Sequence, residues 1–268
     1  MKFISNIVNS GDVWGAPDGV LSLVLADAAN ARAPVIFVAR DDARLALVEA
    51  GLRCINPTLD LWVLPAWDCL PFDRLSPQGG LVGRRIETLA RLCVGEAPSI
   101  LLTTINAIVQ KLPPDDYFTD SSLVITPASA HSPASLAEFL SNQSYLRTDT
   151  VRETGEFAIR GGIVDVFPSV HIDPVRLDFF GDEIETMRFF DAATQRSTGR
   201  LDRLILRPVA EFMLTEASIS RFRTGYLQAF GGSASRDMLY ESVSAGRMHP
   251  GIEHWLPLFH DHLATLAD

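Results

Sequence analysis

Two patterns of hydrophobic and polar residues follow one another along the chain. Up to about residue 121, short apolar runs alternate with segments whose apolar residues recur at helical spacing. The runs at residues 34–39, 61–64 and 99–102 predict buried strands, because β-branched and large apolar residues dominate them. Helices between strands act as crossovers, and crossovers join parallel strands. This part therefore predicts an open, parallel-sheet α/β module.

The ends of several predicted helices are marked by capping residues. Pro17 precedes a helix over residues 18–32, and Asp41 caps a second helix that we expect to stop at Gly51. A further helix is predicted over residues 83–94, and Thr104 caps a short one after the third strand.

Between residues 122 and 209 the apolar period falls to two. One helix comes first, with Ser132 as its cap and Pro133 at its first position. Alternating runs then follow, separated by turn residues such as the Gly161-Gly162 pair, so we expect an antiparallel α+β module with several hairpins. Helical spacing returns at residues 215–230, 233–246 and 250–262.

Composition narrows the possible functions. Apolar residues make up 47% of the 268 residues, enough for a buried core. The net charge of −10 disfavours nucleic-acid binding through the overall field, because such binding relies on neutralised phosphates. Three cysteines without a C-x-x-C pair predict reduced thiols, and neither a signal peptide nor a membrane span is apparent. We therefore expect a cytoplasmic protein.

Tests for catalytic chemistry are mostly negative. A phosphate-binding loop belongs before the first helix, where the chain has glycines at positions 11, 15 and 19. Pro17 removes a backbone donor there, Asp18 adds the wrong charge, and no lysine follows. The six histidines lack a metal-ligand pattern, and no nucleophile elbow is present. The residues alone thus predict a binding module with no catalytic residue, cofactor or metal.

Three stretches carry a family resemblance. They are LPAWDCLPFDRLSPQGGLVGRRIETLARL (64–92), GEFAIRGGIVDVFPSVHIDPVRLDFFGDEIETMRFFDAATQRS (155–197) and GIEHWLPLF (251–259). Together they resemble the N-terminal region of the bacterial transcription-repair coupling factors, the Mfd family, and in outline the repair protein UvrB. The resemblance implies a UvrB-like helicase-type module at 1–121 with a degenerate phosphate loop, an inserted UvrA-docking module at 122–209, and a return segment at 210–268. We expect that return segment to be cut short.

The resemblance also implies a function and partners. In the family this region is a non-catalytic adaptor that recruits UvrA to stalled RNA polymerase for nucleotide excision repair of the transcribed strand. ATP and Mg²⁺, the DNA and the RNA polymerase are bound by other parts of the longer, ATP-hydrolysing translocase. Two alternatives stay open: a UvrB-like DNA-processing ATPase module, and an autoinhibitory module of the parent translocase. Against the first, the connection at residues 67–80 is too short for the DNA-threading hairpin of UvrB.

Three residues of the insert match the UvrA-contacting positions of the family: Arg160, Arg176 and Phe180. Arg176 and Phe180 are four residues apart on one predicted strand and so share a face. Each also has a structural alternative. Arg160 is a candidate partner of Asp165 or Glu156, Arg176 of Asp178, and one of Phe179 and Phe180 belongs in the core.

UvrB proteins commonly carry a second arginine two residues before the one that matches Arg160. This chain has Ala158 at that position, which puts one ion pair of the UvrB–UvrA contact in doubt here.

Overall fold

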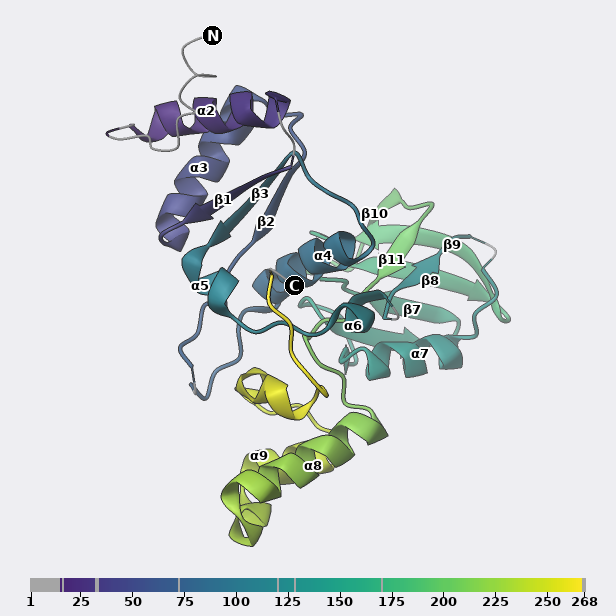
Figure 1. Cartoon of the computed structure of the whole chain (residues 1–268). Helices are drawn as coiled ribbons and strands as arrows, with labels where there is room; N and C mark the ends of the chain where they lie inside the picture. The colour runs from purple at the N-terminus through teal and green to yellow at the C-terminus, as the bar shows by residue number, and fades with distance from the viewer. Residues whose placement is uncertain are drawn as a thin grey trace. The chain divides into compact units, whose positions relative to one another are not determined.

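The computed structural model describes residues 15, 17–31, 34–71, 73–119, 121–127, 129–169 and 171–266 (Figure 1). They divide into two compact units. Unit 1 holds residues 1–66, 88–111 and 265–268, and unit 2 holds residues 67–87 and 112–264. The module boundaries at residues 121 and 209 stay a prediction. The phosphate loop expected around residues 11–19 lies largely outside the described residues.

Unit 1 is built on a three-stranded parallel sheet in the order β1-β3-β2. Its strands are β1 (Val35–Ala39), β2 (Leu61–Leu64) and β3 (Ile100–Thr104). Helices α2 (Asp18–Ala31) and α3 (Asp42–Ile55) bury their apolar residues against one face of this sheet. The three predicted strands and their parallel arrangement are confirmed.

One helix end in unit 1 was predicted wrongly. Asp41 caps α3 as expected, its carboxylate accepting a hydrogen bond from the Arg44 backbone. The helix does not stop at Gly51 but continues to Ile55. A side chain on Gly51 would collide with Ser22, so this glycine lets α2 and α3 pack closely instead of ending the helix.

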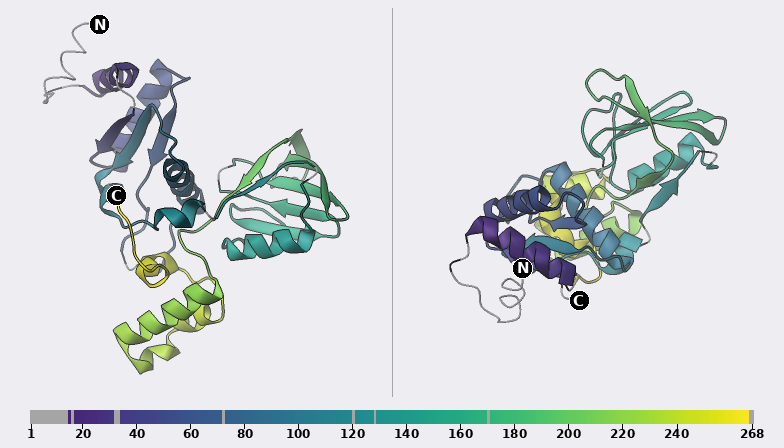
Figure 2. Two further views of the ribbon diagram at one scale, coloured as in Figure 1. Left: turned by 45° about the vertical axis from the view of Figure 1, so that its right-hand side comes forward. Right: turned by 90° about the horizontal axis from the view of Figure 1, so that it is seen from above.

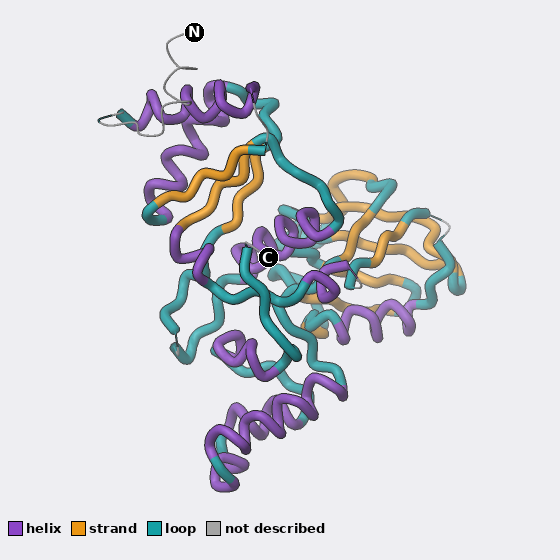
Figure 3. The backbone as a smooth tube through the Cα atoms, in the orientation of Figure 1, coloured by secondary structure: helices purple, strands orange, loops and turns teal. Residues whose placement is uncertain are grey.

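Unit 2 contains a six-stranded sheet, shown in orange in Figure 3, in the order β10-β9-β8-β7-β6-β5. All neighbours are antiparallel except β5 and β6. The strands are β5 (Leu146–Arg147), β6 (Glu156–Arg160), β7 (Ile163–Val166), β8 (Val175–Phe180), β9 (Glu183–Phe190) and β10 (Ser197–Arg200). The parallel and antiparallel sheets together confirm a mixed α/β protein.

One face of the six-stranded sheet is covered. Helix α7 (Pro133–Asn142), capped by Ser132 as predicted, packs on it, and so does the strand pair β4 (Leu123–Ile125) and β11 (Leu204–Leu206) (Figure 2). Strand β11 was not anticipated from the sequence, because its partner β4 lies about 80 residues earlier and the pairing is entirely non-local.

The rest of unit 2 is helical and has its own aromatic core. The helical segment predicted at 215–230 is α8 (Glu216–Phe230), which Thr215 caps. The expected helix over 233–246 is shorter, a 3₁₀ turn η1 (Gly232–Arg236) followed by α9 (Met238–Ser244). The last expected helix is a 3₁₀ segment, η2 (Ile252–Leu258), interrupted at Trp255 and containing Pro257. Unit 2 also contains α6 (Asp115–Thr119), and the described chain includes α4 (Gly79–Cys93) and α5 (Ile105–Val109), the latter capped by Thr104.

Candidate protein-docking site

The candidate site lies on the face of the six-stranded sheet opposite α7. Side chains alternate along β8, so that Val175 and Leu177 enter the core while Arg176 and Phe180 occupy the other face. A register shift beside Phe179 leaves Glu185 of β9 as the extra residue but does not interrupt the alternation of β8. The predicted common face of Arg176 and Phe180 is therefore confirmed.

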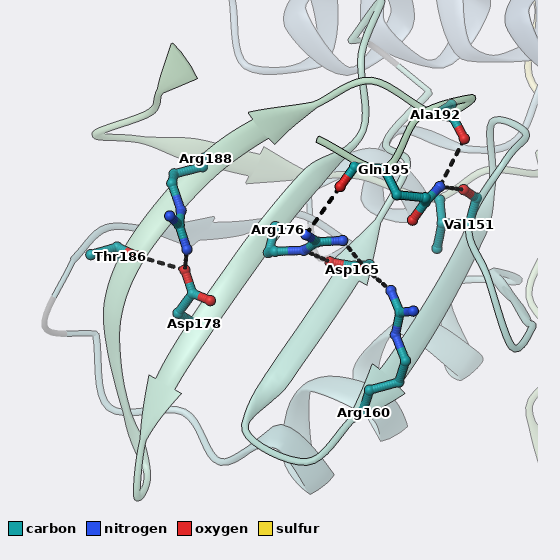
Figure 4. Close-up of polar contacts among 9 residues, drawn as sticks. All are labelled: Val151, Arg160, Asp165, Arg176, Asp178, Thr186, Arg188, Ala192 and Gln195. Atoms are coloured by element: carbon teal, nitrogen blue, oxygen red, sulfur yellow. Dashed lines mark hydrogen bonds and ion pairs between the residues drawn. The ribbon is translucent and has the colours of Figure 1, made fainter. Parts of the chain in front are cut away.

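A buried carboxylate joins two of the candidate residues (Figure 4). Asp165 of β7 is fully buried. It accepts hydrogen bonds from Nε and Nη2 of Arg176 at 2.7 and 2.9 Å, and from Nη2 of Arg160 at 2.6 Å. Asp165 and Arg176 face each other across neighbouring strands, which makes the two-pronged contact possible. The carboxylate thus holds both guanidinium groups on one face.

The guanidinium group of Arg176 makes contacts on several sides. Its guanidinium lies 4.7 Å from the centre of the Phe190 ring, and Nη1 donates to the Gln195 carbonyl at 3.4 Å. The hydrogen bonds that Arg176 donates to Asp165 raise the pKa of Arg176, so the charge is permanent. Only 17% of its side chain is exposed. Arg176 therefore presents a small, rigid part of its guanidinium to a partner.

Arg160 is more accessible, with 48% of its side chain exposed. It ends β6 at a tight turn in which Gly161 has φ +61°, a conformation that favours glycine. Asp165 and Glu156 were the two candidate partners of Arg160, and the structure shows the ion pair with Asp165. Glu156 instead accepts hydrogen bonds from the backbone of Arg152 and Glu153.

Phe180 is 80% exposed, whereas its neighbour Phe179 packs against the core. It ends β8 at the turn formed by Gly181, which is at the same end of the sheet as the turn after Arg160. The Phe179 amide donates to the Gly162 carbonyl at 2.7 Å and ties these two strand ends together. The structure therefore places all three candidate residues on one face.

A second charged cluster on this face was missed by the sequence reasoning. Asp178 was weighed as a partner of Arg176, but its Oδ2 accepts from Arg188 Nη2 at 2.5 Å and from Thr186 Oγ1 at 2.7 Å. Arg188 and Thr186 lie on β9, two residues apart, and that spacing was the only sequence signal that they share a face. Which of the two faces of the sheet carries Arg188 and Thr186 depends on the order of the strands.

Ala158 occupies a small apolar cluster beside the charged residues. It is buried together with Val151, Phe167 and Phe190. Gln195 closes this cluster: its Nε2 donates to the carbonyls of Val151 and Ala192 at 3.0 and 2.7 Å. At the position where UvrB proteins commonly carry an arginine, this chain therefore has a buried alanine that packs against apolar residues.

Buried polar residues elsewhere in unit 2 are engaged structurally. Arg85 donates to Glu211 at 2.5 Å, and Trp67 Nε1 donates to the same carboxylate at 3.3 Å. Among the residues that the structure describes, no group of three or more His, Cys, Asp or Glu residues is placed to hold a metal ion. None of the described helices is long and apolar enough to cross a membrane.

Comparison with known proteins agrees with this geometry. A family described as the UvrB interaction domain matches residues 123–212, a range that contains all three candidate residues and the cluster around Asp178. The transcription-repair-coupling factor of Escherichia coli is 32% identical over 254 residues, covering 93% of this chain and 21% of that protein. The chain is thus homologous to the N-terminal region of transcription-repair-coupling factors.

Other transcription-repair-coupling factors give the same relationship. The Rickettsia conorii protein is 35% identical over 236 residues, covering 87% of this chain, and the Haemophilus influenzae protein is 31% identical over 269 residues, covering 100%. The chain spans about a fifth of the length of these relatives, 21% and 22% respectively. The family resemblance stated from the sequence is confirmed.

Proposed function

We propose that this chain is a non-catalytic adaptor that recruits UvrA to stalled RNA polymerase during transcription-coupled nucleotide excision repair. The observation that carries the proposal is the exposed Phe180 ring on the same face as Arg160 and Arg176, whose guanidinium groups are fixed by a buried carboxylate. Exposed aromatic and arginine side chains are the residue types that dominate binding energy in protein interfaces. Pre-fixed side chains also lose less conformational entropy on binding.

The rest of the activity is proposed for the longer protein. It would bind ATP and Mg²⁺, translocate on DNA and contact RNA polymerase through parts outside these 268 residues, whereas this region uses no cofactor. A degenerate phosphate loop around residues 11–19 fits the same proposal, since Pro17 removes a donor and no lysine follows. We propose a cytoplasmic location, where UvrA and RNA polymerase are found together.

Titration of purified UvrA into this chain tests the proposal. We expect Phe180→Ala to weaken binding at least about 30-fold, the ratio that corresponds to ~2 kcal/mol for a central interface residue. Arg160→Ala and Arg176→Ala should also weaken it. Ile172→Ala is the control, because Ile172 is even more exposed but lies in the β7–β8 connection, at the opposite end of the sheet. Wild-type affinity in Phe180→Ala and Arg176→Ala contradicts the proposal.

A further inference from the structure

The sheet face that carries Arg160, Arg176 and Phe180, here called the charged face, holds further arginines. Arg176 of β8 pairs in register with Arg188 of β9, and Arg188 pairs with Arg200 of β10. Residues paired across neighbouring strands point to the same face, so three arginines form a row. Two carboxylates accompany this row, Asp165 and Asp178. The side chain of Arg200 makes no hydrogen bond or ion pair with any described residue.

Arg188 keeps much of its hydrogen-bonding capacity free. Its side chain is 41% exposed, against 17% for Arg176. Only Nη2 makes a hydrogen bond, to Asp178, while Nε is shielded from solvent and has no partner among the described residues. Arg176, by contrast, uses Nε, Nη1 and Nη2. When Arg188 turns away from Asp178, its guanidinium donors become available to an incoming carboxylate, which binds a guanidinium through two parallel hydrogen bonds.

Asp178 does not depend on Arg188 alone. The Thr186 hydroxyl donates to the same oxygen of Asp178 at 2.7 Å, and 20% of the Asp178 side chain is exposed. If Arg188 turns towards a partner, Asp178 keeps one hydrogen bond and contact with water. The cost of releasing Arg188 is therefore small, as for other exposed ion pairs.

We infer that Arg188 is a further contact of the docking face and that it binds a carboxylate on an acidic surface of the partner protein. This inference rests on the proposed function and extends the UvrA-docking face from β8 onto β9. The row of arginines across β8, β9 and β10 favours an acidic protein surface, because electrostatic complementarity selects partners and accelerates their encounter.

The test measures the affinity of the whole chain for UvrA in Arg188→Ala and Arg188→Lys. We expect Arg188→Ala to weaken binding at least about fivefold, as for an interface residue that contributes measurably. Arg188→Lys should weaken it less, because lysine keeps the charge but not the two-pronged geometry. The control is Arg147→Ala, which removes one exposed positive charge from β5 at the opposite edge of the sheet. Unchanged affinity in Arg188→Ala overturns the inference.

A second pair of variants separates direct contact from an effect through Asp178. In an Asp178→Ala background, a direct contact still loses affinity when Arg188 is replaced by alanine, whereas a residue that only positions Asp178 has no further effect. The second result overturns the inference. Phe180→Ala measured alongside keeps the two proposals apart. If Phe180→Ala weakens binding and Arg188→Ala does not, only this inference fails; if neither does, the docking function fails as well.

Discussion

Asp165 binds Arg176 through both carboxylate oxygens while remaining fully buried beneath the charged face. A buried carboxylate is stable only when ion pairing and hydrogen bonds replace its lost hydration. Arg160 supplies the remaining contact, to the same oxygen that accepts from Arg176 Nη2. The face that carries Arg160 and Arg176 is thus supported by a buried charge.

Removing this carboxylate should both destabilise the fold and weaken docking. We expect Asp165→Ala to lower the free energy of unfolding by about 2–3 kcal/mol, because it strips a partly buried arginine of its charged partner. Urea denaturation measures the loss. Asp178→Ala is the matched comparison and should cost less than about 1 kcal/mol, since its ion pair is partly exposed. Equal losses in the two variants would argue against Asp165 as the support of this face.

The Arg85–Glu211 pair is fully buried and gives a second prediction. We expect Arg85→Met or Glu211→Leu alone to lower the free energy of unfolding by about 3–5 kcal/mol, because each leaves an uncompensated buried group. The double variant Arg85→Met/Glu211→Leu should recover much of this loss, as apolar replacements often do for buried pairs. Thermal or urea unfolding of all three variants checks the coupling; additive losses would contradict it.

Glu253 makes stability depend on pH in a defined direction. Burial raises the pKa of this carboxyl above its ordinary value of 4.5, although Ser76 Oγ donates to it at 2.7 Å. The folded chain therefore holds the proton to higher pH than the unfolded chain does. The stability that this group contributes is complete below pH 4.5 and is lost as the pH rises through the folded pKa.

The variant Glu253→Gln tests this dependence, because glutamine keeps a hydrogen-bonding partner for Ser76 without the titration. We expect the difference in unfolding free energy, variant minus wild type, to increase with pH above 4.5. Urea unfolding of both proteins between acidic and neutral pH measures the difference. Two curves that stay parallel would show that Glu253 titrates normally.

Two glycines of α4 should respond oppositely to alanine. A Cβ on Gly83 would lie 2.5 Å from the Ser169 carbonyl oxygen, whereas a Cβ on Gly80 would meet nothing within 4 Å. We expect Gly83→Ala to lower the free energy of unfolding by about 1–3 kcal/mol through overpacking. Gly80→Ala should raise it by about 0.5 kcal/mol, because alanine restricts the unfolded chain. Thermal unfolding shows whether each variant is more or less stable than the wild type. Unchanged stability in Gly83→Ala would mean that the backbone near Ser169 shifts to make room for the methyl group.

Local signals were sufficient for much of the fold. The β-branched runs located β1, β2 and β3, and side-chain caps at Asp41, Thr104 and Ser132 located helix starts, because each depends on residues only a few positions apart. Helix ends were less predictable. α3 runs through Gly51, where a side chain would collide with Ser22 of α2, so this glycine serves close packing and does not end the helix.

The candidate site shows the same division. The two-residue period placed Arg176 and Phe180 on one face, and it required Phe179 and Phe180 to point in opposite directions. Family resemblance supplied their docking role, which stays a prediction. Neither source placed Arg188 and Thr186 beside Asp178, since that contact joins residues on two strands and depends on how these strands pair.

The sequence by itself determined many of the strands and helix starts and which residues share a strand face, because these follow from the geometry of neighbouring residues. Only the tertiary structure decided that Phe180 is the exposed phenylalanine and that Asp165, rather than Asp178, neutralises Arg176. The physical reason is that an ion pair across a sheet depends on strand order and register. These are set by the burial of β6, β7, β8 and β9 together in one core with α7, not by any one strand alone.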